Sequence, residues 1–168
     1  MNPLYLDTAR LLVRVAPVVL SDGTFALKGG TAINLFVRQV PRLSVDLDLV
    51  YLDRLASHDE ALGRTRESLR EAVPRLARSG IAAIVHEDND VKLFARVGRV
   101  EVKVEVTPVM RGTLRPPRLL SLTSTAEEVL QAEIEVPVVS FEDLYGGKLA
   151  AAMDRQHPRD LFDVMQLF

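Results

Sequence analysis

Residues 42–52, RLSVDLDLVYL, constrain the fold more than any other stretch of the sequence. Side chains of a strand point alternately to its two faces. A strand here has one apolar face, predicted to be buried, made of Val45, Leu47 and Leu49. Asp46 and Asp48 then share the opposite face about 7 Å apart, where they repel each other unless a positive charge lies between them. A divalent cation would supply that charge, and a solvated amphipathic strand is the alternative interpretation.

The composition limits which metal such a site can hold. The 168 residues include no cysteine, which excludes disulfides, thiolate zinc sites and cysteine nucleophiles. The three histidines are too scattered in the sequence to suggest a histidine-rich metal cage. Oxygen ligands would therefore hold any metal, which favours magnesium or manganese over zinc.

Length and hydrophobicity indicate one domain, or one domain with a small helical appendage. Hydrophobic residues make up 48% of the chain, enough for a sizeable core. No apolar run approaches the length of a membrane-spanning helix, and the N-terminus lacks a signal-peptide pattern. We therefore expect a cytoplasmic protein with no membrane association.

Charge is distributed unevenly, although the formal net charge is only -2. Residues 92–118 contain seven basic and two acidic side chains, whereas residues 119–147 contain six carboxylates and no lysine or arginine. The basic stretch favours a polyanionic partner such as RNA or nucleotide phosphates. An ordinary solvated surface explains the same excess equally well.

The order of predicted helices and strands describes an α/β or α+β fold with a mixed sheet. We predict strands at 24–27, 43–51, 81–86, 91–97, 100–106 and 133–139. We predict helices at 4–20, after Gly30, and at 59–78, 125–131, 140–155 and 158–168. Residues 1–139 are expected to form the core, and residues 140–168 a C-terminal helical segment.

Gly29 and Gly30 lie where the predicted strand 24–27 meets the next helix. Glycine lets the backbone approach a phosphate closely, and the free N–H groups and dipole of a helix N-terminus favour an anion. The stretch matches neither a P-loop nor a Rossmann turn. By themselves, the two glycines are equally consistent with an ordinary turn.

A third carboxylate comes from the stretch GRVEVKVEVTPV. Valines fill one face of the predicted strand, and Glu101 and Glu105 lie on the other. Beside the strand 43–51, one of these glutamates would approach Asp46 and Asp48. Three carboxylates facing a glycine turn suit two-metal phosphoryl or nucleotidyl transfer, in which metals neutralise the phosphates and align the attacking oxygen.

Three motifs, in this order, resemble those of a known family. KGGTAINLF, RLSVDLDLVYL and KLAAAMDRQHPRDLFDV together are similar to the AbiEii/AbiGii-type nucleotidyltransferase toxins of abortive-infection and toxin–antitoxin systems. The resemblance covers residues 27–164 and implies a core like that of the DNA polymerase β-like nucleotidyltransferases.

The resemblance implies roles for individual residues. It assigns nucleotide binding to Gly29, Gly30, Thr31, Ser44 and Lys148. It assigns metal binding to Asp46, Asp48 and Glu105, and it adds Lys148 and Asp160 as catalytic residues. Arg42 belongs to the second motif. Glu101 stays open as an alternative to Glu105, and Asp163 as an alternative to Asp160.

The last motif also has simpler interpretations. Lys148 begins an otherwise apolar stretch of helix, where a lysine ordinarily extends to solvent. Turned inward, its ammonium would bind a triphosphate as a point charge. Asp163 lies four residues after Arg159, the spacing of a helix salt bridge. The break before Pro158 lets the second helix fold back, so that Lys148 and Asp160 converge on the metal carboxylates.

The activity implied is the transfer of a nucleoside monophosphate from an NTP to an acceptor, with magnesium or manganese as cofactor. By family analogy the acceptor is tRNA, and a cognate antitoxin is a further partner. Transfer to a small molecule or a protein hydroxyl stays open, as does a nucleotide-binding regulatory module without turnover. Family members generally continue beyond the last motif, so we expect a minimal or a shortened member of the family.

Overall fold

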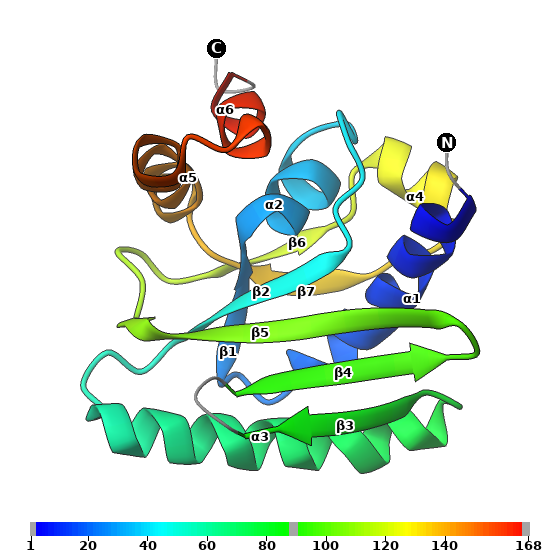
Figure 1. The fold of residues 1–168 in the computed structure, drawn as a ribbon, viewed down its shortest axis with the longest axis vertical. Coiled ribbons are helices and arrows are strands. Elements are labelled where there is room, and N and C mark those ends of the chain that lie inside the picture. The colour runs from blue at the N-terminus through cyan, green and yellow to red at the C-terminus, as the bar shows by residue number, and fades with distance from the viewer. Residues whose placement is uncertain (1–2, 88–90, 166–168) are drawn as a thin grey trace.

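A mixed sheet organises the chain, with strand order β3-β4-β5-β2-β1-β7-β6 (Figure 1). The structure is a computed structural model, and it describes residues 3–87 and 91–165. Its strands are β1 (Phe25–Lys28), β2 (Asp46–Tyr51), β3 (Ala82–His86), β4 (Lys92–Val97), β5 (Val100–Arg111), β6 (Arg118–Ser121) and β7 (Glu135–Val138). β1 is antiparallel to β2, whereas β5 is parallel to β2 and β7 is parallel to β1. The expected mixed sheet is confirmed.

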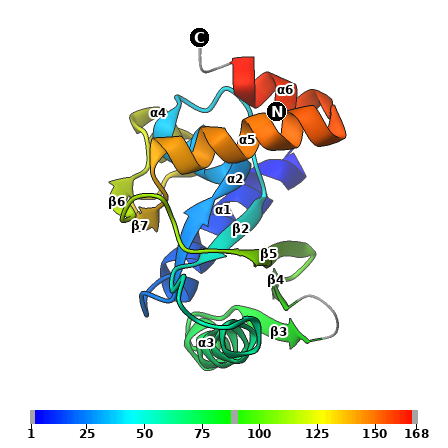
Figure 2. The same ribbon diagram turned by 90° about the vertical axis from the view of Figure 1, so that its left-hand side faces the viewer.

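Helices lie at one face and one end of the sheet (Figures 1 and 2). They are α1 (Pro3–Val19), α2 (Gly29–Thr31), the π-helix η1 (Ala32–Val37), α3 (His58–Arg78), α4 (Ser124–Leu130), α5 (Phe141–Arg155) and α6 (Pro158–Met165). α1 packs against β5 and α3 against β3, while α5 and α6 pack against each other and α5 contacts α2. No helix in the described part of the chain is long and apolar enough to span a membrane.

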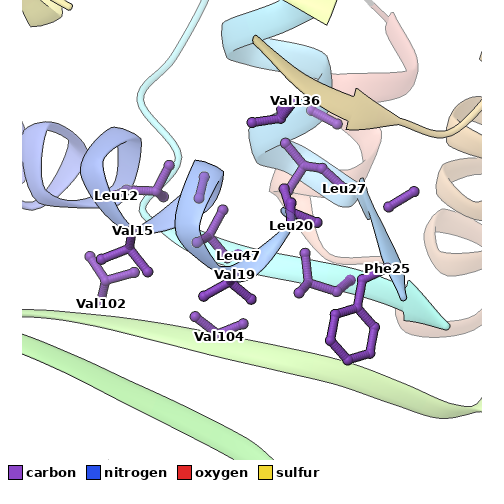
Figure 3. Packing of buried hydrophobic residues seen from close by; sticks show 14 of the residues in the cluster. Leu12, Val15, Val19, Leu20, Phe25, Leu27, Leu47, Val102, Val104 and Val136 are labelled. Atoms are coloured by element: carbon purple, nitrogen blue, oxygen red, sulfur yellow. The ribbon is translucent and has the colours of Figure 1, made fainter. Parts of the chain in front are cut away.

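The core lies between α1 and the sheet (Figure 3). Figure 3 shows buried side chains of α1 meeting those of the strands, with Leu12, Val15 and Val19 facing Leu47, Val102 and Val104. Leu47 and Leu49 are fully buried, whereas Asp46 is exposed. The predicted buried face is therefore confirmed at Leu47 and Leu49, whereas Val45 lies before β2 and is half-buried.

Helix ends follow local signals that the sequence carries. Ser57 accepts a hydrogen bond from the Glu60 backbone N–H, and the Glu60 carboxylate accepts one from the Ser57 N–H, so a complete capping box begins α3. At α5, Ser140 caps the Asp143 N–H in the same way. The Asp143 carboxylate instead accepts hydrogen bonds from the Leu114 N–H and the Ser140 hydroxyl, so this box is only half formed.

Several elements differ from the sequence-based expectations. β2 begins at Asp46 rather than 43, and β5 runs on to Arg111 rather than ending at 106. β6 was not predicted, because its four residues are mostly exposed and lack alternation. The helix after Gly30 becomes a π-helix at Ala32, which apolar spacing does not distinguish from an α-helix. Residues 166–168, the end of the last predicted helix, lie outside the described residues.

The packing of α1 can be tested by cavity formation. Leu12→Ala should lower the free energy of unfolding by about 3 kcal/mol, because a fully buried leucine leaves a cavity that closes only partly. Leu4→Ala in the same helix is the matched control, since Leu4 is 55% exposed, and it should change stability by less than about 0.5 kcal/mol. Urea denaturation followed by circular dichroism measures both, and equal losses would contradict the packing described here.

Candidate functional site

The glycine turn lies directly against Asp48. β1 ends at Lys28, and Gly29 follows with a φ of 77°, a backbone conformation that L side chains rarely adopt. A Cβ on Gly29 would lie 2.5 Å from Asp48 Oδ2, closer than van der Waals contact allows. The turn and the carboxylate therefore fit together only because residue 29 has no side chain.

Gly30 is required for a different reason, because three polar side chains surround it. A Cβ there would lie 2.8 Å from Arg42 Nη2, 3.2 Å from Ser44 Oγ and 3.6 Å from Asp163 Oδ2. Arg42 and Ser44 precede β2, whereas Asp163 comes from α6. All three predicted motifs thus meet at this turn.

Thr31 and Asn34 fix the helix behind the turn, and both are fully buried. Thr31 Oγ1 donates a hydrogen bond of 2.6 Å to the Asp46 carbonyl, which joins the helix to the start of β2. Asn34 Nδ2 donates to the Gly30 carbonyl at 2.7 Å and lies 3.4 Å from Asp163 Oδ1. Asn34 was not predicted, since a lone asparagine within an apolar helix carries no recognisable motif.

The sheet register places Glu105 beside Asp48. β2 and β5 pair in parallel, so that Asp46 lies opposite Lys103 and Asp48 opposite Glu105. Glu101 lies two residues before Lys103, outside the register with β2, and is exposed. The structure therefore brings Glu105, and not Glu101, next to the two aspartates.

Lysines surround this carboxylate group. Lys103 Nζ lies 2.7 Å from one Glu105 oxygen and Lys92 Nζ lies 3.3 Å from the other. Lys28 lies opposite Asp48 in the β1–β2 pair. The sequence analysis assigned no role to any of these lysines, because their positions depend on strand pairing.

The pKa values of Asp48 and Glu105 are shifted in opposite directions. Burial raises the pKa of Asp48; Lys28 partly offsets this effect, but the negative charges of Asp46 and Glu105 raise the pKa again. Burial also acts to raise the pKa of Glu105, but hydrogen bonds from Lys103 and Lys92 outweigh it and lower the pKa. Negative charge is therefore poorly compensated at Asp48, and a cation there would relieve the repulsion.

The side chains of Asp46, Asp48 and Glu105 suit a hard cation by their chemistry. Among the residues that the structure describes, no three His, Cys, Asp or Glu side chains are grouped closely enough to hold a metal ion. Asp46, Asp48 and Glu105 nevertheless offer only oxygen donors on adjacent strands, which is the chemistry that magnesium or manganese prefers. The under-compensated carboxylate of Asp48 fits such an ion.

An ionic cluster of Arg42, Lys148, Asp160 and Asp163, in which both aspartates are buried, joins α5 and α6 to the glycine turn. Lys148 Nζ lies 2.9 Å from Asp160 Oδ1 and 3.0 Å from Asp163 Oδ2. Arg42 Nε and Nη2 donate to the two oxygens of Asp163 at 2.9 and 2.6 Å. The side chain of Lys148 is only 12% exposed, so the lysine points inward and does not extend to solvent.

The turn between the two helices makes this cluster possible. α5 ends at Arg155, its C-cap residue Gln156 has a φ of 49°, and α6 begins at Pro158. α6 therefore folds back against α5, as the proline break predicted. Asp163 is fully buried and forms ion pairs with Arg42 and Lys148. Its spacing of four residues from Arg159 had suggested a salt bridge within the helix and did not indicate these partners.

Comparisons with known proteins bear on this arrangement. A family model described as "Nucleotidyl transferase AbiEii toxin, Type IV TA system" matches residues 10–168. A comparison with curated protein sequences finds no match. MenT4, a nucleotidyltransferase toxin from Mycobacterium tuberculosis H37Rv, has a similar structure, with a TM-score of 0.58 at 20% identity. The likeness covers 87% of this chain but 52% of MenT4, so this chain spans about half the length of MenT4.

A second solved structure shares the fold. It is ANT(2")-Ia in complex with adenylyl-2"-tobramycin, with a TM-score of 0.51 at 15% identity. The likeness covers 93% of this chain and 85% of that chain. The two solved structures show that this chain shares their fold. The family model matches the sequence itself, from within the first helix to the last motif.

The charge of Asp163 should stabilise the fold at neutral pH. Burial acts to raise the pKa of Asp163, but hydrogen bonds from Arg42 and Lys148 outweigh it and hold the pKa below the ordinary carboxylate range. A lowered pKa stabilises the folded state above about pH 4, and this stabilisation is lost as the pH falls through the lowered pKa. Asp163→Asn should therefore lower the free energy of unfolding by about 3 kcal/mol at pH 7, and by less in acid.

Urea denaturation at pH 7 and in acid measures this difference. Asp154→Asn, at an exposed position of α5, is the matched control and should change stability by less than about 0.5 kcal/mol at either pH. If Asp163→Asn lowers the free energy of unfolding by the same amount at neutral pH and in acid, the role assigned to the charge is contradicted.

Proposed function

Because this chain belongs to the AbiEii family of nucleotidyltransferase toxins, we propose that it transfers a nucleoside monophosphate from an NTP to an acceptor hydroxyl. One observation carries the proposal: the glycine turn contacts both Asp48 of β2 and the ionic cluster of α5 and α6. The turn that would bind phosphate therefore lies between a carboxylate that would bind metal and the cluster that holds the inward lysine, which supports phosphoryl transfer. The proposal takes residues 1–139 as the core and residues 140–168 as the segment that supplies the lysine.

Asp46, Asp48 and Glu105 are the residues that would hold magnesium or manganese. When bound, such an ion neutralises phosphate charge and orients the triphosphate. The chain's own contribution is to hold two carboxylates on one strand with a third beside them, and to keep Lys92 and Lys103 next to Glu105. The pKa of Asp48, raised first by burial and then by the charges of Asp46 and Glu105, supports this assignment, because perturbed pKa values cluster at functional sites.

Gly29 and Gly30 would bind phosphate through their backbone. Without side chains they leave the N–H groups at the start of the helical segment 29–37 open to an anion. Ser44 Oγ lies close to Gly30 and can donate a further hydrogen bond, whereas the Thr31 hydroxyl already donates to the Asp46 carbonyl. We therefore assign phosphate contact to Ser44 and a supporting role to the Thr31 side chain.

Lys148 would stabilise the charge that develops on the leaving pyrophosphate. Its ammonium is held between Asp160 and Asp163, and Asp163 Oδ2 in turn lies near Gly30. The contact of Asp160 with the ammonium favours a role in orienting Lys148 over a role as the base for the acceptor hydroxyl. Such fixed charges are effective because they need no reorganisation during the reaction.

The acceptor and partners belong to the same proposal. The family description names a toxin of a type IV toxin–antitoxin system, which supports a cognate antitoxin and an NTP substrate. A cytoplasmic location is part of the proposal. We propose tRNA as the acceptor. A second candidate is a small-molecule hydroxyl, favoured by the adenylyl-2"-tobramycin bound to the structural neighbour ANT(2")-Ia. Incubation with each labelled NTP, magnesium, and either total tRNA or an aminoglycoside distinguishes the two acceptors.

Removing one metal-type carboxylate should weaken metal-dependent nucleotide binding. Asp48→Asn should weaken NTP affinity in magnesium by about tenfold or more, since even residues that only touch metal ligands cost that much when changed. The matched control is Asp53→Asn, because Asp53 is exposed and follows the same strand. Calorimetric titration with and without EDTA measures the effect, and an affinity equal to that of the wild type under both conditions would rule out this metal site.

Truncating the inward lysine should impair turnover more than nucleotide affinity. Lys148→Ala should reduce kcat by about a hundredfold or more, the scale of losing one preorganised electrostatic contact. Because the substitution also leaves Asp160 and Asp163 without their shared cation, it should destabilise the fold. Assays should therefore run well below the melting temperature of the variant, with circular dichroism as the check on folding. A kcat within about threefold of wild type under these conditions would exclude the catalytic role.

A further inference from the structure

Asn34 is a buried polar side chain in an otherwise apolar helical turn. Its neighbours in the π-helix η1 are apolar and buried: Ala32, Ile33, Leu35 and Phe36. No described residue offers a hydrogen-bond partner to Asn34 Oδ1. A buried acceptor without a partner has a free-energy cost that a leucine at this position would avoid. Core packing alone therefore does not explain the asparagine.

The contacts of Asn34 Nδ2 fix the orientation of the amide. The nitrogen donates to the Gly30 carbonyl at 2.7 Å and lies 3.4 Å from Asp163 Oδ1. Both of these oxygens are acceptors, so the nitrogen and not the oxygen of the amide must face them. A leucine would donate to neither oxygen, and an aspartate would repel both. The amide therefore bridges the glycine turn and the ionic cluster without adding charge.

The bond to the Gly30 carbonyl also orients the next N–H group. In a planar trans peptide, a carbonyl and the following N–H point in opposite directions, so a fixed Gly30 carbonyl sets the direction of the Thr31 N–H. Thr31 lies in the first turn of the helical segment 29–37, where N–H groups point toward the helix N-terminus. Asn34 thus controls one of the N–H groups at the proposed phosphate-binding turn.

The backbone of Asn34 secures the bend that follows the π-helix. Val40 has a φ of 52°, a strained conformation for a β-branched residue. Its N–H donates to the carbonyl of Asn34 at 3.2 Å and to that of Arg38 at 2.8 Å. Strained backbone of this kind persists only where its surroundings hold it. Two residues later Arg42 reaches Asp163, so Asn34 supports this bend as well as the glycine turn.

From these contacts we infer that Asn34 is a positioning residue, which holds the glycine turn in the geometry that binds the triphosphate of the NTP. The inference rests on the proposed nucleotidyl transfer and adds a residue that acts through Gly30. The ionic cluster depends less on Asn34, because Arg42 and Lys148 bind Asp163 more closely, at 2.6 and 3.0 Å. Asn34 should therefore affect nucleotide affinity more than the placement of Lys148.

Nucleotide affinity and turnover are measured separately on the full chain. Asn34→Leu keeps a side chain of similar size without donors, and it should weaken NTP affinity in magnesium by about tenfold, the scale of losing one hydrogen bond. The loss should be equal for all four NTPs, because they share the triphosphate. At saturating NTP, kcat should stay within about threefold of wild type, since binding lost equally from ground and transition states leaves kcat unchanged.

Ser68→Ala is the matched control for lost stability. Ser68 is buried too, and its hydroxyl donates to Asp22, so the substitution also removes a partly buried hydrogen bond. Ser68 belongs to α3, which is well separated from α2 in Figures 1 and 2. Both substitutions should lower the urea midpoint of unfolding, but only Asn34→Leu should weaken NTP affinity.

NMR of the unmodified protein tests the same contact without any substitution, and it decides the case if the variant does not fold. Addition of inorganic tripolyphosphate should shift the side-chain amide signal of Asn34, because this amide donates to the turn that would bind the phosphate. The side-chain amide of Gln131, exposed at the end of α4, is the control and should not shift.

The outcomes separate this inference from the proposed function. Wild-type protein that binds no NTP would contradict both. NTP binding that Asn34→Leu leaves unchanged, or weakens no more than Ser68→Ala does, would overturn the inference and leave the proposed function intact. An Asn34 signal that tripolyphosphate does not shift, in a protein that binds NTP, would do the same. A fall in kcat at unchanged NTP affinity would also overturn it, because Asn34 would then act on the chemical step and not on the turn.

Discussion

The Asp163 carboxylate, fully buried between Arg42 and Lys148, is the contact on which the arrangement of the site depends. A buried charge is costly unless it is paired and hydrogen-bonded, so its partners must stay in place. Arg42 lies 121 residues away in the sequence and shortly before the strand of the aspartates. This one carboxylate therefore fixes α6 to both the glycine turn and β2, and it holds Lys148 inward at the same time.

The site combines one satisfied and one unsatisfied group of charges. Asp163 has a lowered pKa because two cations donate hydrogen bonds to it, whereas burial and neighbouring carboxylates raise the pKa of Asp48. The first arrangement stabilises the fold at neutral pH, and the second opposes it. A poorly compensated carboxylate such as Asp48 is expected where a ligand supplies the missing interaction, since folds tolerate such unfavourable charge mainly at functional sites.

Local patterns predicted the faces of the strands, but the register decided the members of the site. Alternation in residues 42–52 gave the buried and polar faces of β2 correctly, because a period of two is a property of the strand itself. The choice of Glu105 over Glu101 depends on how β5 pairs with β2, which no local pattern encodes. The same limit applies to Asp163: a local spacing of four suggested Arg159, whereas its actual partners lie on other elements.

The uneven charge of the sequence acquires a definite location in the sheet. β4 and β5 are adjacent antiparallel strands, so alternation directs Lys92, Arg96 and Lys103 to the same side as the aspartates of β2. Further along the chain, Arg115 bonds Glu142 of the acidic stretch, so basic and acidic regions neutralise each other at that point. The same alternation puts Glu101 opposite Arg96, and Glu105 within ion-pair distance of Lys92 and Lys103, so the basic side chains of this face lie among carboxylates. Attraction for a polyanion and repulsion by the bare aspartates act on the same face, so an anionic acceptor is favoured there only once the negative charge of the aspartates has been offset.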